Sequence, residues 1–135
     1  MTYDYTLQSS TTPGPISPIS WVEESIVFAL ENIPKEKILM GIPLYSYLWK
    51  DQKASALVAS SVENILSNIN TTPKYDPKIK EGLIEYLCLD GLRCTLYFQS
   101  QQSVLDRVTL AKKYSLLGVT YWRLGSEGDL LNSVL

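Results

Sequence analysis

The sequence predicts an α/β fold with a small α+β insertion, and three observations support this prediction. A helical apolar pattern over residues 20–32 leads into a buried-strand run over 38–45. Residues 46–100 interrupt this rhythm with short strands and a hairpin signal. A helix followed by a buried strand then returns over residues 100–122. The expected order is strand, helix, strand, insertion, helix, strand and helix.

The first half contains the clearest helix-to-strand unit. Met1–Tyr5 has strand character, and a loop rich in Ser, Thr, Pro and Gly follows at residues 8–18. Ser20 and Glu23 predict a capping box for a helix that ends near Asn32. The apolar run ILMGIPLY that comes next is typical of a strand buried on both faces of a parallel sheet.

The insertion starts with short elements. We expect a strand at residues 54–58 and then a helix that Ser60 and Glu63 cap. Residues 70–80 form a polar connection that contains prolines.

Asp90-Gly91 predicts a hairpin turn between strands at residues 83–89 and 92–98. Cys88 and Cys94 flank this turn, and they face each other only in some registers. We expect two small buried thiols rather than a disulfide.

The C-terminal part repeats the α/β pattern. Ser100 is expected to cap a helix whose apolar residues recur at helical spacing. A buried strand is predicted at residues 117–122, and a last short helix at residues 128–135.

The composition excludes several kinds of function. The chain has no histidine and two cysteines, so we expect no Ser-His or Cys-His nucleophile pair, no metal site and no cofactor. A net charge of -2 and a pI near 5.1 argue against nucleic acid as a partner. The chain has no apolar run of about 20 residues and no signal-peptide pattern, so we expect neither a membrane span nor a leader.

Three motifs resemble one enzyme family. MTYD at residues 1–4, GIPLY at 41–45 and GVTYWRLG at 118–125 resemble the sixth, seventh and eighth strands of glycoside hydrolase family 18. The spacer at residues 13–45 and YWRLGSEGD at 121–129 are most similar to its bacterial spore-cortex and peptidoglycan N-acetylglucosaminidases.

This resemblance implies a partial TIM (β/α)8 barrel, made of its last three strands with their helices. Barrel segments would occupy residues 1–50 and 100–135, and a chitinase-insertion-like α+β subdomain would occupy residues 51–99. A complete barrel takes about 250 residues, so three strands are too few to close one.

The resemblance also implies catalytic roles for Tyr3 and Asp4. Tyr3 would contact the N-acetyl group that acts as the internal nucleophile, and Asp4 would be its polar neighbour in the cleft. A phenol can stabilise a developing oxazolinium without titrating. From the residues alone, the expected role of Tyr3 is instead that of a strand aromatic with a satisfied hydroxyl.

Four further residues are expected to bind the sugar. Trp122 would form the floor of the subsite at the cleavage point, and Arg123 would hydrogen-bond a sugar or pair with a carboxylate. Tyr45 and Tyr47 would line the cleft after the seventh strand. The alternatives are a core tryptophan at the barrel mouth and a structural arginine.

Some positions depart from the family pattern. Where many relatives have GIPLYGYDW, Ser46 replaces a glycine and Leu48 an aspartate. Cys94 and the neutral pair Gln99-Ser100 stand where relatives have a histidine and an acidic pair. These changes put substrate contacts near the insertion in doubt.

The acidic motif DxxDxDxE of the family is absent from this sequence. Glu127 is the one tempting substitute, and we expect it to be a surface residue. The predicted function is therefore a fragment of a glycoside hydrolase that acts on β-1,4-linked N-acetylglucosamine glycans by substrate-assisted hydrolysis, with the acid supplied elsewhere. The alternatives are a lectin-like carbohydrate-binding remnant, and an assembly fragment that forms a homo-oligomer or binds a complementing N-terminal barrel portion.

Overall fold

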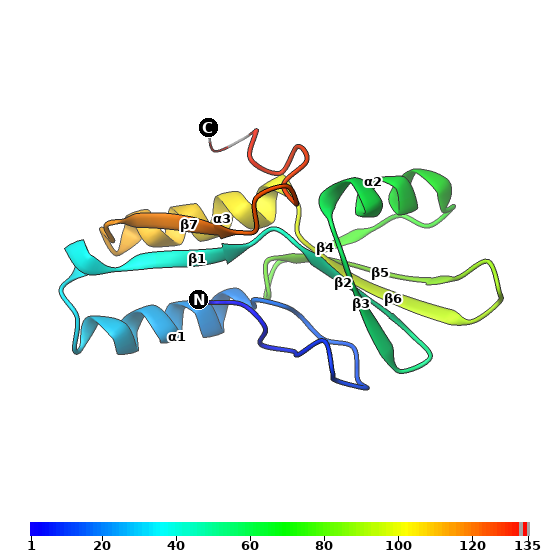
Figure 1. Ribbon diagram of the computed structural model, residues 1–135, viewed down its shortest axis with the longest axis horizontal. Coiled ribbons are helices and arrows are strands. Elements are labelled where there is room, and N and C mark those ends of the chain that lie inside the picture. Colours follow the sequence, from blue (N-terminus) through cyan, green and yellow to red (C-terminus); the bar gives the residue numbers. More distant parts are fainter. Residues whose placement is uncertain (133, 135) are drawn as a thin grey trace.

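Two β-sheets lie one after the other along the long axis of the computed structural model, which describes residues 1–132 and 134 (Figure 1). The first sheet pairs β1 (Leu39–Pro43) in parallel with β7 (Gly118–Trp122). The second is antiparallel and has the order β3-β2-β6-β5-β4. Its strands are β2 (Ser46–Lys50), β3 (Lys53–Leu57), β4 (Lys74–Asp76), β5 (Glu81–Leu87) and β6 (Arg93–Phe98).

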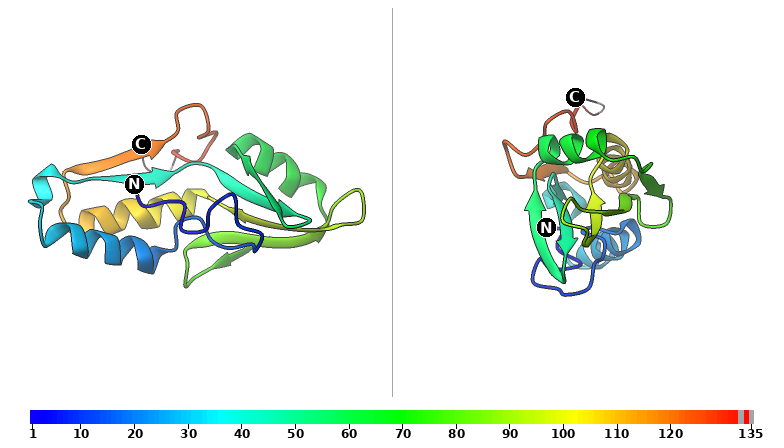
Figure 2. Two further views of the ribbon diagram at one scale, coloured as in Figure 1. Left: turned by 60° about the horizontal axis from the view of Figure 1, so that its bottom comes forward. Right: turned by 90° about the vertical axis from the view of Figure 1, so that its right-hand side faces the viewer.

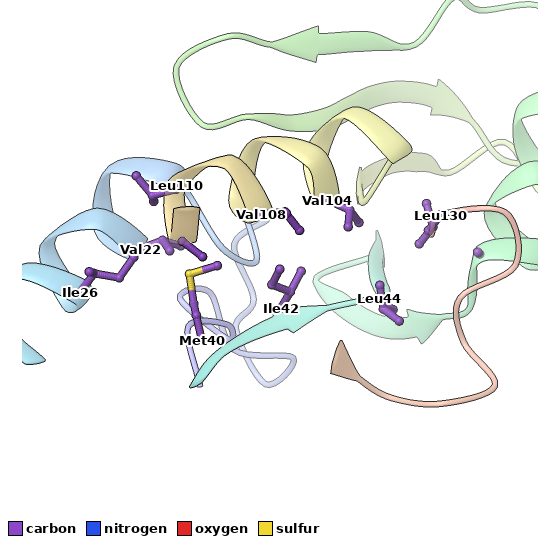
Figure 3. Close-up of a cluster of buried hydrophobic side chains, with 11 residues drawn as sticks. Val22, Ile26, Met40, Ile42, Leu44, Val104, Val108, Leu110 and Leu130 are labelled. Atoms are coloured by element: carbon purple, nitrogen blue, oxygen red, sulfur yellow. The ribbon is translucent and has the colours of Figure 1, made fainter. Parts of the chain in front are cut away.

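Helices α1 (Ile19–Leu30) and α3 (Gln101–Lys113) cover the same side of the β1–β7 sheet (Figure 2). Met40, Ile42 and Leu44 alternate along β1 and point toward these helices (Figure 3). They pack with residues of α1, α3 and the C-terminal turns, namely Val22, Ile26, Val104, Val108, Leu110, Ala111 and Leu130. The α/β character predicted from the sequence is confirmed.

The second sheet packs against α2 (Ala59–Asn68) on one face. Val62, Ile65 and Leu66 of this helix pack with the strand residues Ile84, Leu96 and Phe98. The short 3-10 helix η1 (Lys35–Lys37) leads into β1. None of the helices in the described residues is long and apolar enough to cross a bilayer.

Met1–Tyr5 does not form the predicted strand. Its contact with β1 runs through Thr2, whose backbone N–H and Oγ1 both donate to the Gly41 carbonyl, at 3.4 and 2.7 Å. Asp4 then adopts a φ of 63°, which takes the chain out of the extended conformation.

Two of the three predicted helix caps are wrong. Neither Ser20 nor Ser60 caps a helix, because tertiary contacts take over both helix starts. The first N–H of α1 donates to the Ile79 carbonyl, and that of α2 donates to the Ser126 carbonyl. Ser100 caps α3 as predicted, and its hydroxyl accepts the third backbone N–H of the helix at 3.1 Å.

Other elements also differ from the prediction. The connection at residues 70–80 contains the edge strand β4. Residues 128–132 form turns rather than the last helix, and 133 and 135 of that predicted helix lie outside the described residues. Strand β7 is partly buried or exposed at every position instead of buried as predicted.

The two cysteines form a disulfide, so the prediction of free thiols is wrong. Cys88 and Cys94 are joined across the hairpin with a Cα–Cα distance of 5.8 Å. Gly91 takes a φ of 79°, and the Cys88 N–H donates to the Leu92 carbonyl. This turn sets the register that brings the cysteines together.

A buried ion pair joins helix α3, which covers the first sheet, to strand β5 of the second sheet. Arg107 of α3 donates to the Glu81 carboxylate of β5 at 3.0 Å, and both side chains have no exposed surface. Glu81 also accepts the backbone N–H groups of Ile16 and Ser17, at 2.9 and 2.6 Å. Burial raises the pKa of Glu81, and the guanidinium acts in the opposite direction.

We predict that Arg107→Met lowers the free energy of unfolding by about 3 kcal/mol, because it leaves the Glu81 carboxylate buried without its cation. Urea unfolding followed by circular dichroism would measure the change. Lys113→Met is the matched control, since Lys113 forms an exposed pair with Glu23, and it should change stability little. Equal effects of the two substitutions would contradict a special role for the buried pair.

We also predict that reduction of the disulfide lowers the free energy of unfolding by about 2 kcal/mol, because Cys88 and Cys94 close only a short loop. Urea unfolding with and without reductant would measure the difference. In the double variant Cys88→Ser with Cys94→Ser, reductant should have no effect. A wild-type protein that is equally insensitive would disprove the prediction.

Candidate functional site

An open pocket of about 360 Å³ lies where β1 and β7 end. The Leu44 N–H donates to the Trp122 carbonyl at 2.7 Å, which continues the pairing one residue beyond β1. The carboxyl ends of both parallel strands therefore face the pocket, as they do at ligand sites of α/β folds. The lining residues are Asp4, Gln8, Tyr45, Tyr47, Ala56, Leu57, Val58, Trp122, Arg123 and Ser126.

Asp4 holds two tyrosines at the pocket wall. Its Oδ1 accepts hydrogen bonds from the hydroxyls of Tyr45 and Tyr47, the latter at 2.8 Å. Burial and these hydrogen bonds raise the pKa of Tyr45 far above its usual value and that of Tyr47 to about 12. Both phenols therefore stay neutral near pH 7 and act as donors to Asp4.

Tyr3 lies next to this group but does not line the pocket. Its ring packs edge-on against Tyr45, with the centroids 6.1 Å apart. Burial, and then the neighbouring Asp4 charge, raise the pKa of Tyr3. The contact of Tyr3 with the pocket thus runs through Tyr45.

Trp122 and Arg123 also line the pocket. Trp122 ends β7, and 54% of its surface is exposed. A cis peptide bond joins it to Arg123, whose side chain is also exposed. An indole and a guanidinium therefore face solvent beside the Asp4 carboxylate.

A series of aromatic rings, first tilted and then edge-to-face, extends from the pocket into the second sheet. Centroids are 5.3 Å apart for Tyr45 and Tyr47, 5.5 Å for Tyr47 and Trp49, and 6.0 Å for Trp49 and Tyr97. The Trp49 Nε1–H also donates to the Ser10 carbonyl at 3.1 Å. Because Tyr47 and Trp49 are buried, this series holds the pocket wall in one arrangement.

The positions that depart from the family pattern lie outside the pocket. The Ser46 Oγ accepts the Gln99 N–H at 3.2 Å. Leu48 points to the other face of the sheet, where it packs near α2. Cys94 is in the disulfide, and the Gln99 amide is buried without a partner in the described part of the chain.

Among the described residues that line this pocket, Asp4 alone carries a carboxylate. Glu127 does not line it, and its carboxylate accepts the Gly125 N–H within the loop after β7. Among the described residues, no group of three or more Asp, Glu, Cys or His side chains is arranged to hold a metal ion.

Gln8 and Ser126 line the pocket and were not predicted. Gln8 is placed there by a hydrogen bond from its Nε2 to the Ala54 carbonyl at 3.3 Å. Ser126 is placed by its backbone contact with the start of α2, at Ala59. Both contacts join residues far apart in sequence, so no local pattern indicates them.

We predict that the protein loses stability above about pH 10 more steeply than a Tyr47→Phe variant. An unfolded tyrosine titrates near pH 10, whereas the folded-state pKa of Tyr47 is about 12. The stability from this group is complete below pH 10 and is lost as the pH rises toward 12. Urea unfolding between pH 9 and 12 would measure the slopes. The control variant Tyr5→Phe, at an exposed ring, should keep the wild-type slope; a wild-type slope for Tyr47→Phe would contradict the prediction.

Comparison with known proteins finds relatives of the kind that the three sequence motifs resemble. The chain is 30% identical over 131 residues to the cortical fragment-lytic enzyme of Bacillus subtilis (strain 168), covering 93% of this chain and 30% of that protein. The spore cortex-lytic enzyme SleL of Bacillus cereus superposes with a TM-score of 0.89 at 26% identity, over 100% of this chain and 34% of that one. A chitinase from Chromobacterium violaceum ATCC 12472 superposes with a TM-score of 0.90 at 30% identity, over 96% and 41%.

The chain therefore spans about a third of the length of these relatives. The family model of the glycosyl hydrolases family 18 matches residues 1–127. The family predicted from the three motifs is confirmed, and the chain belongs to glycosyl hydrolases family 18.

Proposed function

We propose that this chain supplies one wall of the substrate cleft of a glycosidase that acts on β-1,4-linked N-acetylglucosamine glycans, such as chitin or peptidoglycan. The observation that carries the proposal is the pocket at the ends of β1 and β7, which joins the Asp4–Tyr45–Tyr47 cluster to Trp122 and Arg123. The names of the relatives, a cortical fragment-lytic enzyme and a chitinase, support this class of substrate.

The surrounding fold is proposed to be the last part of a TIM (β/α)8 barrel. In this proposal, residues 1–50 and 100–135 are barrel segments, and residues 51–99 are an inserted subdomain. The parallel pairing of β1 with β7 and the two helices on one side of them support it.

The proposed chemistry is substrate-assisted hydrolysis. The carbonyl oxygen of the sugar's N-acetyl group attacks the anomeric carbon, and the bond to the leaving oxygen breaks. Asp4, with Tyr3 beside it, stabilises the positive charge that develops on the oxazolinium, because a carboxylate held by two neutral phenols is fixed in place beforehand. The acid that protonates the leaving oxygen comes from outside this chain.

Trp122 and Arg123 are proposed to bind the sugar. The exposed indole offers a flat apolar surface to the C–H faces of a pyranose ring, and transfer of this surface out of water favours binding. Arg123 offers hydrogen-bond donors to sugar hydroxyls or to a carboxylate.

A second candidate is a carbohydrate-binding module without catalysis. Three aromatic residues in the pocket lining, Tyr45, Tyr47 and Trp122, support it, because aromatic rings can bind a sugar face without catalysis. In either case we propose that another segment covers the free edge of β7, supplied by a complementing barrel portion or by a second copy of the chain. The exposed side chains of Leu117, Trp122 and Leu124 support this proposal.

The proposal is tested by measuring hydrolysis of a fluorogenic chitotrioside and binding of chitotriose in the same sample. We expect binding without turnover by this chain, and Trp122→Ala should weaken binding about tenfold or more. Phe28→Ala is the matched control, since Phe28 is an aromatic residue of α1 that is 71% exposed and lies outside the pocket. It should leave binding unchanged.

Tyr3→Phe tests whether any turnover that is observed depends on this site, with Tyr5→Phe as its control. Turnover by the wild type that Tyr3→Phe abolishes would show that an acid does act in this chain, and would overturn the statement that it comes from outside. Binding that depends on Trp122 without turnover would support a sugar-binding wall. Absence of both binding and turnover would contradict the proposed function of this chain.

A further inference from the structure

Asp4 has a backbone conformation that needs support. Its φ of 63° lies in the left-handed region, which is unfavourable for residues with a Cβ atom. Such a residue at a ligand site persists only where its surroundings impose the conformation. The contacts on both sides of Asp4 show which residues do so.

The residues before and after Asp4 are both tied to the same short segment. Ahead of it, the Ser17 hydroxyl donates to the Thr2 carbonyl at 2.5 Å. Behind it, the Tyr5 N–H donates to the Ile16 carbonyl at 2.9 Å. Ile16 and Ser17 are fully buried, so Asp4 is held on two sides by a segment that is itself fixed.

This segment is in turn held by the buried ion pair. The Glu81 carboxylate accepts the N–H groups of Ile16 and Ser17. Arg107 donates from Nε to the Ser17 hydroxyl at 3.2 Å and from Nη2 to the Ser17 carbonyl. A continuous hydrogen-bond chain thus runs from α3 through Ser17 to the backbone beside Asp4.

We propose that Ser17 and Arg107 are positioning residues for the pocket. They hold the backbone of Asp4 so that its carboxylate lies between the hydroxyls of Tyr45 and Tyr47. Neither Ser17 nor Arg107 lines the pocket, so both act on a bound N-acetylglucosamine glycan only through Asp4. The inference rests on the proposed function for the identity of that ligand.

The test is a double-mutant cycle with Ser17→Ala and Asp4→Gly, read by calorimetric binding of N,N′,N″-triacetylchitotriose. Glycine adopts a φ of 63° freely, so Asp4→Gly removes the carboxylate and the need for the clamp together. We expect Ser17→Ala to weaken binding about tenfold in the wild-type background and to have no further effect in the Asp4→Gly background. Ser25→Ala is the matched control, because the Ser25 hydroxyl donates within α1, to the Trp21 carbonyl at 2.8 Å.

Hydrogen exchange of the Tyr5 amide provides a readout that needs no glycan. Exchange should be faster in Ser17→Ala and unchanged in Ser25→Ala. Faster exchange in a protein whose wild type binds no chitotriose would support the clamp and reject the proposed function. Unchanged exchange, or an equal loss of binding with and without Asp4, would overturn the inference.

Discussion

The buried contact between Glu81 and Arg107 is the constraint on which the arrangement of this chain depends. It joins β5 of the second sheet to α3, which covers the first. Taking two charges out of water is costly. The pair is tolerated because Glu81 accepts backbone N–H groups from the loop before α1, and Arg107 donates to backbone carbonyls beside it. These hydrogen bonds have preferred directions, so they fix how β5 and α3 are oriented relative to each other. Apolar packing alone would not fix that orientation.

The pocket depends on this contact because its lining comes from both sheets. Tyr47 lies on β2 of the second sheet with Tyr45 just before that strand, whereas Trp122 ends β7 of the first. The distance between the phenols and the indole is therefore set by how the sheets meet. Within the second sheet, the aromatic series and the Asp4 carboxylate hold the phenols in place.

Elements set by local patterns were predictable, and elements set by distant partners were not. The strands at β1 and β7 and the cap at Ser100 follow from nearby residues, and the structure contains them. The cap at Ser20 fails because the start of α1 bonds to Ile79, which no local pattern indicates. Arg107 gives a partial signal, since it interrupts the apolar face of α3, but its partner Glu81 lies on another element.

The site shows the same division. The motifs place Asp4, Tyr45, Tyr47, Trp122 and Arg123 around one pocket, and these residues line it. Gln8 and Ser126 line the pocket as well, through hydrogen bonds to Ala54 and Ala59, which are far from them in sequence. Pairing of the cysteines depended on hairpin register, which the turn residues alone leave open.

The alternation of side chains along β2 has a consequence for how this surface can diverge. Tyr47 and Trp49 belong to the aromatic series that starts at the pocket, whereas Leu48 packs near α2 on the other face. Substitutions on the α2 face can accumulate together with changes in that helix, without altering the pocket wall. Leu48 therefore lies on the face away from the pocket wall, where a change of residue alters the packing against α2 and leaves the aromatic series in place.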